Sequence, residues 1–570
     1  MREYRSGSQI LFGYLPEQTV DLAGRVWKVR NWVQPIPRSV DDTTLRDELL
    51  RQASAWERTG NDGDFVRDLR RGVPVQIHTL NFEAGVHVYS YPNVWICKVC
   101  SHVDSSDERQ CLCGARRWGQ FHFVGYHDCG SIREPWLTRC AQHRQIRIRF
   151  PGTASAAEIV LDCPVCGVVL RRGLGMPNCS CGNGRIVFTV HRAARVYTPR
   201  SVVIVNPPTP ARIQGLREAG GATRALQWVV DGMQARTAKE IGRTRSAFLR
   251  QLLDQGFDPE SAESLTARAV ELGQVTDEVQ SVIDIPEPYR TEAEDQAVKI
   301  ALATIESRAR CEDMARLAAP GSELRVLYDQ TYPRVFTSSG LQGVELIDRF
   351  PVLTGIYGFT RGDAAPGASR LVAFHDRRGQ YVVYSDIAQT EALFVRLLPT
   401  RVAQWLQHRG FRLETWGDAR SARLAILRAA LVPPPGSDPP PLPTVGSELL
   451  TLVHSYAHRF IRRAAVLAGL DRNSLSEFLV PTHLGFFVFA AARGGFVLGG
   501  LQALFESDLH QLLEEVAFAE HRCALDPGCE HSGASCAACL HLGEPSCRWF
   551  NRYLDRRTLF GPSGYIQLNV

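Results

Sequence analysis

The chain has 570 residues, of which 44% are hydrophobic and 22% are charged, as is ordinary for a globular protein with about four domains of ~150 residues each. Its formal net charge of +5 is small over this length and gives little indication of a polyanionic partner. A helical membrane span is excluded, because no apolar run reaches about 18 residues. The best candidate, residues 484–504, contains Arg493 and five glycines.

The patterns along the chain predict an α+β protein of several domains, with zinc-ribbon β modules in the N-terminal half, a central helical region and a C-terminal α/β zinc-binding domain. The predicted parts are an N-terminal α+β region (1–90), a double zinc-ribbon domain (91–206), a helical region (207–320), an α/β region (321–431), a Pro-rich linker (432–443) and a C-terminal zinc-binding domain (444–570). The linker is assigned because a proline run favours an extended, semi-rigid spacer.

Hydrophobic periodicity predicts the main helices and strands. Strands are predicted at residues 25–29, 75–78, 145–150, 370–374, 380–384 and 486–489, and helices at 41–58, 222–234, 262–272, 391–410 (interrupted or kinked at Pro399), 449–469 and 508–521. The strands at 370–374 and 380–384 form a hairpin across the turn Arg377-Arg378-Gly379.

Two cysteine quartets of the form CxxC…CxCG lie in residues 91–206. The first consists of Cys97, Cys100, Cys111 and Cys113, and the second of Cys163, Cys166, Cys179 and Cys181. Two thiolates on one tight turn and two on a facing turn give the tetrahedral S4 geometry that suits zinc, so each quartet predicts one structural zinc site. The alternatives are disulfides or chance. Clustered CxxC motifs without a signal-peptide pattern favour metal and a reducing, cytoplasmic location.

A further group of metal-ligating residues lies between the two quartets. It consists of His127, Cys129, Cys140 and His143, and the Cys140–His143 spacing is typical of ligands. These residues are candidates for a third zinc site or for an exchange of ligands with the second quartet. The alternative is that they are packing residues.

The excess positive charge is concentrated in the cysteine-rich segment. Residues 91–200 contain fifteen Lys and Arg against seven Asp and Glu. A basic zinc module is typical of nucleic-acid binding. The candidate phosphate contacts are Arg116, Arg117, Arg171 and Arg172, each pair beside a cysteine turn, and the alternative for all four is a solvated charged face.

The C-terminal region contains a second cluster of cysteines, with five candidates for four ligand positions. We predict a site at Cys529, Cys536, Cys539 and Cys547, with Cys523 in reserve. Altogether the sequence predicts three or more structural Zn²⁺ ions. Cys311 stands apart and is predicted to be a small core residue.

Sequence motifs of catalysis are absent. No GxxxxGK[ST] motif occurs, which excludes a P-loop ATPase. His454 and His458 lie four residues apart on one face of a predicted helix, but no Glu follows His454 as a zinc protease would need. We therefore predict a non-enzymatic protein and keep a metal-dependent hydrolase that uses these two histidines as an alternative.

A series of C-terminal motifs resembles a known family. It comprises Leu452 to His458, Gly499-Gly500-Leu501, Cys536-Ala537-Ala538-Cys539-Leu540, Glu544-Pro545-Ser546-Cys547 and Asn551 to Arg556. This series is similar to the zinc-binding C-terminal domain of MrfA-type repair helicases and of the DrmB family, the helicase-associated subunits of the DISARM anti-phage defence system. Residues 349–351, 357–361 and 391–394 resemble DrmB more loosely. The absence of a motor favours DrmB over the helicase.

The resemblance implies a non-catalytic subunit that pairs with a DrmA-like DNA helicase of superfamily 2, and binds DNA through that complex. A DNA methyltransferase of the defence system is a further candidate partner. The alternative is a zinc-stabilised scaffold that contacts proteins and does not touch DNA.

Overall fold

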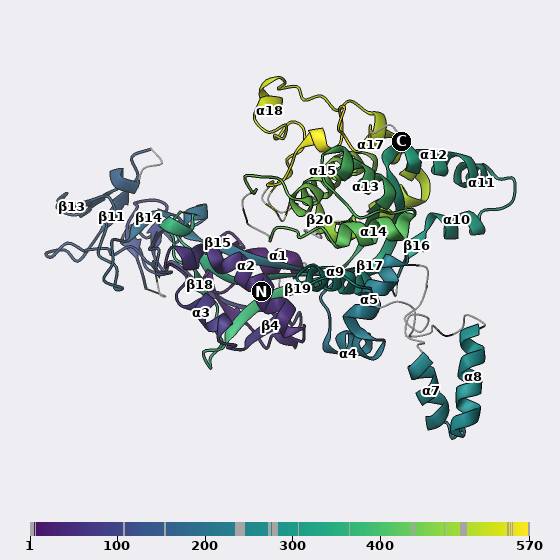
Figure 1. Cartoon of the computed structure of the whole chain (residues 1–570). Helices are drawn as coiled ribbons and strands as arrows, with labels where there is room; N and C mark the ends of the chain where they lie inside the picture. Colours follow the sequence, from purple (N-terminus) through teal and green to yellow (C-terminus); the bar gives the residue numbers. More distant parts are fainter. Residues whose placement is uncertain are drawn as a thin grey trace. The chain divides into compact units, whose positions relative to one another are not determined.

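The computed structural model has an α+β fold, as the sequence predicts (Figure 1). The structure describes residues 5–567, except for residues 6, 107–108, 153–155, 234–244, 272–274, 276–282, 306, 364, 435–436, 438, 472–473, 491–498, 544–545, 548 and 550. The sequence also predicts a turn at Gly494-Gly495, and these residues lie outside the described part of the chain.

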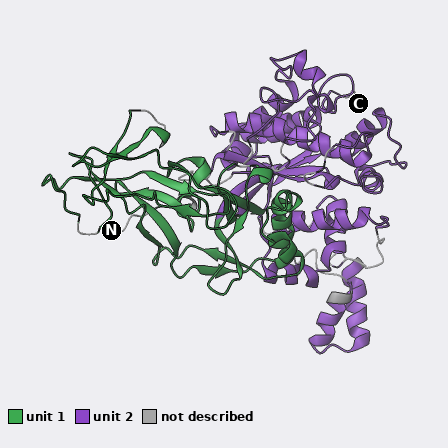
Figure 2. Ribbon diagram, turned by 90° about the vertical axis from the view of Figure 1, so that its left-hand side faces the viewer, with its two compact units in different colours: residues 1–204, 353–387 green, residues 205–352, 388–570 purple. Residues whose placement is uncertain are grey.

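The chain divides into two compact units (Figure 2). Unit 1 comprises Met1–Ile204 and Leu353–Ile387, and unit 2 comprises Val205–Val352 and Ala388–Val570. All three points at which the chain passes between the units fall within strands, namely β15 (Thr198–Val205), β17 (Leu341–Thr360) and β19 (Tyr381–Leu397). The boundary predicted at residue 206 lies close to the first of them, whereas the predicted linker 432–443 connects two parts of unit 2.

Unit 1 contains a few helices and many short strands. Its helices are α1 (Gly7–Gly13), α2 (Asp42–Arg58) and α3 (Phe65–Arg70), and its further strands are β1 (Thr19–Leu22), β2 (Arg25–Trp32), β3 (Ile36–Arg38), β4 (Val75–Thr79), β5 (Val86–Ser90), β6 (Trp95–Cys97), β7 (Val103–Asp104), β8 (Trp118–Gln120), β9 (Phe123–Tyr126), β10 (Ile132–Arg133), β11 (Arg147–Arg149), β12 (Val160–Asp162), β13 (Val169–Arg172), β14 (Val187–Val190) and β18 (Val372–Ala373). Helix α2 begins where Asp41 accepts a hydrogen bond from the backbone N–H of Thr44 at 2.9 Å, as an N-cap residue does.

The core of unit 1 forms where helices α2 and α3 pack on its strands. Leu49, Trp56 and Phe65 share one buried apolar cluster with Tyr357 and Val383 of the strands. Strand β19 runs parallel to β4 here. The predicted hairpin at residues 370–384 is confirmed, because the N–H of Val382 donates to the carbonyl of Phe374 across the Arg377–Gly379 turn.

The cysteine-rich part of unit 1 is built from three small antiparallel sheets. Their strand orders are β7-β6-β8, β10-β9-β14 and β11-β12-β13. Residues 94–174 contribute a small set of buried apolar side chains, among them Phe121, Ile148 and Leu161. Such a small core stabilises a β module only weakly on its own.

Unit 2 is mainly helical around its own strands. Its helices are α4 (Pro210–Glu218), α5 (Gly221–Val230), α7 (Arg245–Asp254), α8 (Pro259–Glu271), α9 (Tyr289–Thr304), α10 (Cys311–Leu317), α11 (Glu323–Val326), α12 (Tyr332–Ser339), α13 (Pro399–His408), α14 (Ala419–Leu427), α15 (Val445–Leu467), α16 (Gly500–Ala503), α17 (Leu509–Phe518) and α18 (Gly528–His531), and its further strands are β16 (Ala309–Arg310), β20 (Leu475–Val480) and β21 (Gly485–Ala490). One buried core runs from Cys311 to Ile566 and surrounds α15, which confirms Cys311 as a core residue.

One predicted helix of unit 2 is partly wrong. Residues 391–397 belong to strand β19, where Ala392 to Arg396 pair with Gly485 to Phe489 of β21. Helix α13 begins at Pro399, so this proline starts the helix and does not kink it. Proline is favoured at the first helical position, because its missing N–H has no partner there in any case.

Candidate metal centres

Groups of Cys and His side chains that could hold a metal ion occur in both units. Within each group the ligand atoms lie within 4.8 Å of one another. Four of the groups in the described chain are built largely or wholly from cysteines: Cys97, Cys100, Cys111 and Cys113 (cluster A); His127, Cys129, Cys179 and Cys181 (cluster B); Cys140, His143, Cys163 and Cys166 (cluster C); and Cys523, Cys529, Cys536 and Cys539 (cluster D). Clusters A, B and C belong to unit 1, and cluster D to unit 2.

Cluster A confirms the grouping predicted for the first quartet. Its Sγ–Sγ distances are 3.6 Å between Cys97 and Cys113, and 3.3 Å from Cys111 to both Cys100 and Cys113. Bonds of about 2.3 Å to a central zinc would place two sulfurs of a tetrahedron ~3.8 Å apart. A disulfide would instead require about 2.05 Å. The thiols are therefore spaced as ligands of one shared ion.

The second quartet is wrong as a single site. Its CxxC half joins Cys140 and His143 in cluster C, and its CxC half joins His127 and Cys129 in cluster B. The exchange of ligands considered from the sequence is thus what the structure shows. All four intervening residues belong to candidate metal groups.

Distances within clusters B and C are those of ligands around one point. In cluster C, His143 Nδ1 lies 3.6 Å from the Sγ atoms of both Cys140 and Cys163. In cluster B, the Cys129 and Cys179 Sγ atoms are 3.6 Å apart. His127 Nδ1 is likewise 3.6 Å from Cys181 Sγ.

The two clusters are nested along the chain. Cluster B takes its first ligands from the loop between β9 and β10 and its last ones from the loop before β14. The segment between these loops contains all of cluster C and the sheet β11-β12-β13. Each of the three sheets therefore has its own cluster at one end.

The same backbone loop presents the first ligand pair of cluster A and both ligand pairs of cluster C. The N–H of Cys97 donates to the carbonyl five residues later, and the residue four positions later donates back to the Cys97 carbonyl. Cys140 and Cys163 repeat both hydrogen bonds. The residue after each second ligand has a left-handed backbone: Ser101 (φ 61°), Arg144 (φ 56°) and Gly167 (φ 72°). Cys140-x-x-His143 is therefore a ligand loop of the same kind as the two CxxC loops.

Cluster D corrects the ligand choice at the C-terminal site. Cys523, held in reserve from the sequence, lies 3.5 Å from Cys536 between Sγ atoms, and Cys529 lies 3.8 Å from Cys539. Cys547 is not a member. The nearly buried Arg556 donates to Cys529 Sγ at 3.5 Å, and its positive charge offsets part of the negative charge of a sulfur-only site.

One thiol in each cluster is poised to ionise, as a metal ligand must be. Burial raises the pKa of Cys97, but N–H groups of Cys100 and Val99 outweigh it and bring that pKa to about 7. In cluster C, hydrogen bonding from the His143 backbone lowers the pKa of Cys140 to about 6.

Clusters D and B have such a thiol as well. Burial raises the pKa of Cys536, but the N–H of Cys539 and the thiol of Cys523 bring it to about 7. The pKa of Cys179 is also lowered, because the N–H of Cys181 outweighs burial.

The four arginines predicted to contact phosphate differ in exposure. Arg116 and Arg117 are exposed in the loop between cluster A and β8. Arg171 and Arg172 lie on β13, so consecutive side chains point to opposite faces of the sheet. Arg172 is exposed, whereas Arg171 is half-buried against Gly175. The structure therefore supports three of the four as accessible cations.

His454 and His458 lie on α15, as predicted, and are completely buried together with Cys547 and Glu477. Glu477 was not predicted as a ligand. Its only signal is a charged residue in the otherwise apolar or small run of β20.

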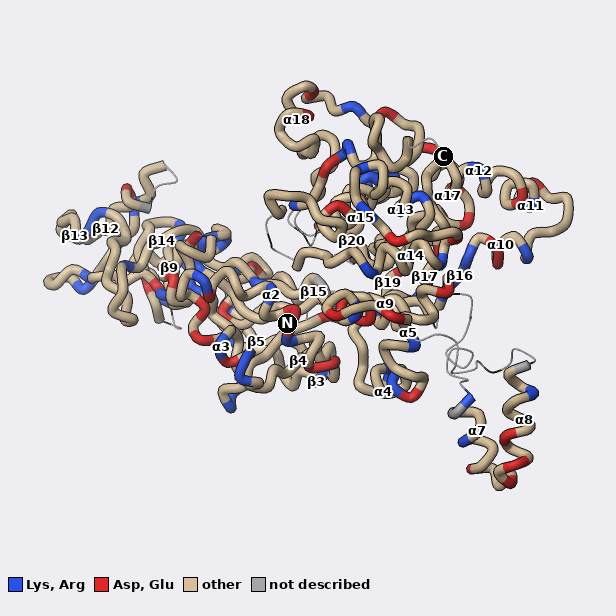
Figure 3. The backbone as a smooth tube through the Cα atoms, in the orientation of Figure 1, with Lys and Arg blue, Asp and Glu red and all other residues tan. Residues whose placement is uncertain are grey.

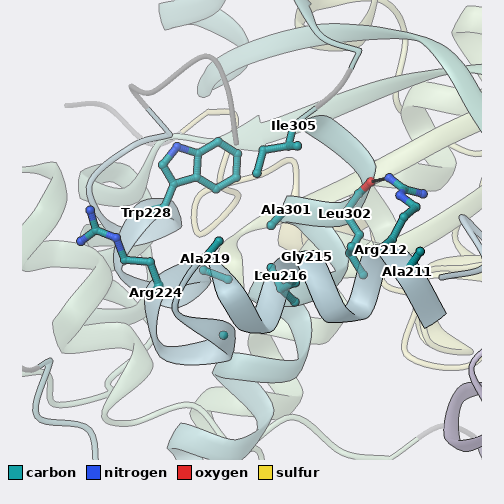
Figure 4. A pocket seen from close by; sticks show the side chains of 12 residues that line it. Ala211, Arg212, Gly215, Leu216, Ala219, Arg224, Trp228, Ala301, Leu302 and Ile305 are labelled. Carbon is teal, nitrogen blue, oxygen red and sulfur yellow. Dashed lines mark hydrogen bonds between the residues drawn. The ribbon is translucent and has the colours of Figure 1, made fainter. Parts of the chain in front are cut away.

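An apolar pocket of about 320 Å³ lies between α4, α5 and α9 in unit 2 (Figure 4). Its lining includes Leu216, Trp228 and Ile305, and its charged side chains are Arg212 and Arg224. Arg212 donates hydrogen bonds to Asn206 and to the carbonyl of Leu302. Among the described residues that line this pocket there is no Asp, Glu, His, Cys or Ser, so these residues supply no acid–base or nucleophilic group.

Residues 6–197 match a domain family of unknown function, DUF8724. The matched stretch contains clusters A, B and C and none of unit 2. A search of the curated proteins gave no match. In the described part of the chain, no helix is both long enough and apolar enough to cross a membrane.

Proposed function

We propose that this chain is a zinc-stabilised, non-catalytic subunit that binds DNA together with a superfamily 2 helicase, in an anti-phage defence complex of the DrmB kind. The observation that carries the DNA-binding part is the excess of exposed cations around clusters A, B and C. The helicase and the defence system rest on the C-terminal sequence resemblance.

Zinc is the proposed ion because of the donor set. Thiolates with one imidazole or none are the ligands of structural zinc, and four protein ligands leave no open position for a reacting water. The clusters would therefore act as cross-links of small sheets, and catalysis by these ions is not expected.

The cluster-bearing segment, residues 91–200, is basic, with fifteen Lys and Arg against seven Asp and Glu. Figure 3 marks where these residues lie along the backbone. The exposed cations of the segment are Lys98, Arg116, Arg117, Arg133, Arg139, Arg144, Arg149, Arg172, Arg185, Arg192 and Arg195. The exposed acids among its described residues are Glu134 and Glu158. Guanidinium groups bind phosphate through paired hydrogen bonds, and a backbone-directed contact of this kind is independent of base sequence.

Some of these cations are held in place by the protein, while others are not. Arg149 contacts the buried Asp162 at 2.6 Å, and so has a structural role. Within the described chain, Arg116, Arg117 and Arg172 form no ion pair with an acidic side chain. These three are the residues with which to test DNA binding.

The test is a salt titration of DNA binding by the full chain, alone and with the helicase with which it copurifies. The triple variant Arg116→Ala, Arg117→Ala, Arg172→Ala should bind a partly single-stranded DNA at least tenfold more weakly at low salt. Its salt slope should fall by about 2–3, since each phosphate contact contributes ~0.7–0.9.

The matched control removes the same charge from unit 1 outside the clusters. Arg30, Arg58 and Arg71 are also exposed, so their triple alanine variant should keep nearly the original affinity and slope. Equal losses of DNA affinity in both variants would show that only the net charge of the protein matters. An unchanged salt slope in the first variant would reject the proposed DNA contact.

A second candidate function is a protein-binding scaffold, which a different observation favours. Apolar side chains project from the ligand loops: Val99 and Leu112 of cluster A are 67% and 75% exposed, and Val165 and Val168 of cluster C are 57% and 55% exposed. Exposed apolar groups on a rigid loop are typical of protein contacts.

The two candidates predict opposite outcomes. If these loops bind a protein, changing Val99 and Leu112 to Ser should abolish copurification with the helicase while DNA binding by the isolated chain persists. If the chain binds DNA through its arginines, the arginine variant should lose DNA binding and retain the helicase. An isolated chain that binds no DNA at low salt would leave the scaffold as the better account.

A further inference from the structure

Besides clusters A to D, the described chain contains one more group of four potential metal ligands, which lies in the core of unit 2. His454 and His458 are one turn apart on α15, Glu477 lies on β20, and Cys547 precedes the C-terminal segment. Their exposed fractions are 0% for the first three and 2% for Cys547. No other buried group of the described chain combines imidazole, carboxylate and thiol in this way.

The ligand atoms converge on one point. His454 Nε2 lies 3.0 Å from Glu477 Oε1 and 3.3 Å from Cys547 Sγ. His458 Nε2 lies 3.3 Å from Glu477 Oε2. Around a tetrahedral zinc, nitrogen and oxygen ligands at about 2.0–2.1 Å would be ~3.3 Å apart, and nitrogen and sulfur ~3.5 Å apart. The observed separations match these edges closely.

Direct hydrogen bonds do not account for the group. Although the distances are short, neither carboxylate oxygen of Glu477 has a hydrogen-bond partner among the described residues. The Nε2 atom of His458 is also without one. Glu477 therefore has two histidine nitrogens at short range but accepts no aligned hydrogen bond. A buried carboxylate in that position is costly, and a cation placed between these atoms would remove that cost.

Neighbouring backbone groups orient the ligands as the outer shell of a metal site does. His458 Nδ1 lies 2.8 Å from the carbonyl of Leu540. Because a carbonyl only accepts, Nδ1 carries the proton and the Nε2 lone pair faces the group. The N–H of Asn551 donates to Cys547 Sγ at 3.2 Å, which stabilises a thiolate.

Charge also balances around a divalent ion. Glu477 and Cys547, when ionised, supply two negative charges and the two neutral imidazoles supply none. A dication therefore gives a neutral site, which suits complete burial better than any charged alternative.

We propose that His454, His458, Glu477 and Cys547 bind one divalent transition-metal ion, zinc under ordinary conditions, and that this ion fastens the C-terminal segment to α15 and β20. The backbone supports the same link, because the N–H of Glu477 donates to the carbonyl of Ser546 at 3.2 Å. Since the ligands have almost no exposure, the ion is structural, and this closed site offers no position for a substrate of the hydrolase considered from the sequence. The proposal does not depend on DNA or helicase binding.

Metal counting by native mass spectrometry of the full chain tests the site. The Cys547→Ser variant should carry one divalent ion fewer than the parent chain. The matched control is Cys311→Ser, since Cys311 is also buried in unit 2 but belongs to no ligand group, and it should keep the parent count. A folded Cys547→Ser chain with the parent count would overturn the proposal.

A second measurement covers the case in which Cys547→Ser does not fold. Crystals of the parent chain grown with Zn²⁺, measured on both sides of the zinc absorption edge, should show an anomalous peak between the two histidines and Glu477. Peaks at clusters A to D without one at this group would also overturn the proposal.

Discussion

The cysteine-rich part of unit 1 and the core of unit 2 are stabilised in different ways. In unit 1, three small sheets share few buried apolar side chains, and each sheet ends in its own cluster of Cys and His ligands. In unit 2, a large apolar core surrounds α15, and Cys547 of the buried group with His454, His458 and Glu477 belongs to that core. With the proposed ions bound, metal would substitute for a hydrophobic core in the first region and supplement a core in the second.

Removal of metal should affect the two regions very unequally, and this is the largest effect that we expect. When a chelator strips the full chain, amides of β6, β9 and β12 should lose their protection from hydrogen exchange, because the remaining core is too small to hold these strands. Amides of α15 and β21 should stay protected. Hydrogen exchange with mass spectrometry measures both regions in one sample. If both regions kept their protection equally, the cysteine-rich part of unit 1 would not depend on metal for its stability.

Arg361 joins the cluster-bearing segment to the rest of unit 1. It is completely buried, and its guanidinium donates to the carbonyls of Gly130, Val196 and Glu17. Arg361→Ala removes the donor from the buried carbonyl of Val196 and from the half-buried carbonyls of Gly130 and Glu17. At ~1.5 kcal/mol for each charged hydrogen bond, the lower figure for such bonds, the change should cost about 4–5 kcal/mol of the stability of unit 1.

Urea denaturation measures this loss, and the exposed neighbour Arg195 provides the control. Arg195→Ala should change stability by less than about 0.5 kcal/mol. A similar small change for Arg361→Ala would show that the cluster-bearing segment does not need this anchor.

A smaller effect tests the shape of the ligand loop. Gly167 has φ 72°, and a Cβ added there meets no atom within 4 Å. Gly167→Ala therefore costs only the left-handed backbone strain, about 1 kcal/mol, and should weaken metal binding at cluster C about fivefold. Competition with a chromophoric chelator measures this. Gly215→Ala, at an open position inside helix α4, should leave the affinity unchanged.

The sequence predicted the pieces of these sites better than their grouping. Cluster A was predicted correctly because no ligand of another cluster lies between its four cysteines in the sequence. Clusters B and C were misgrouped, because the second CxxC is close in sequence to a CxC that serves another sheet. The available signal was that His127-x-Cys129 has the spacing of the CxC pair and Cys140-x-x-His143 that of the CxxC pair. The nested strand order of the structure is needed to show which loops meet.

Helices and strands with strong local patterns were predictable, because their signal lies within one short stretch of the sequence. Helix α15 and strand β21 were expected from periodicity, whereas residues 391–397 were taken as helix because buried strands and helices have similar composition. Glu477 carried no local signal of a ligand, since its partners come from a helix and a loop distant in sequence.

The grouping of ligands in unit 1 can be measured directly by counting metal in two double variants of the full chain. Cys163→Ser with Cys179→Ser should lose two ions, because the structure places these residues in different clusters, whereas Cys163→Ser with Cys166→Ser should lose one. Loss of a single ion from the first pair would contradict the nested arrangement and restore the quartet suggested by the sequence.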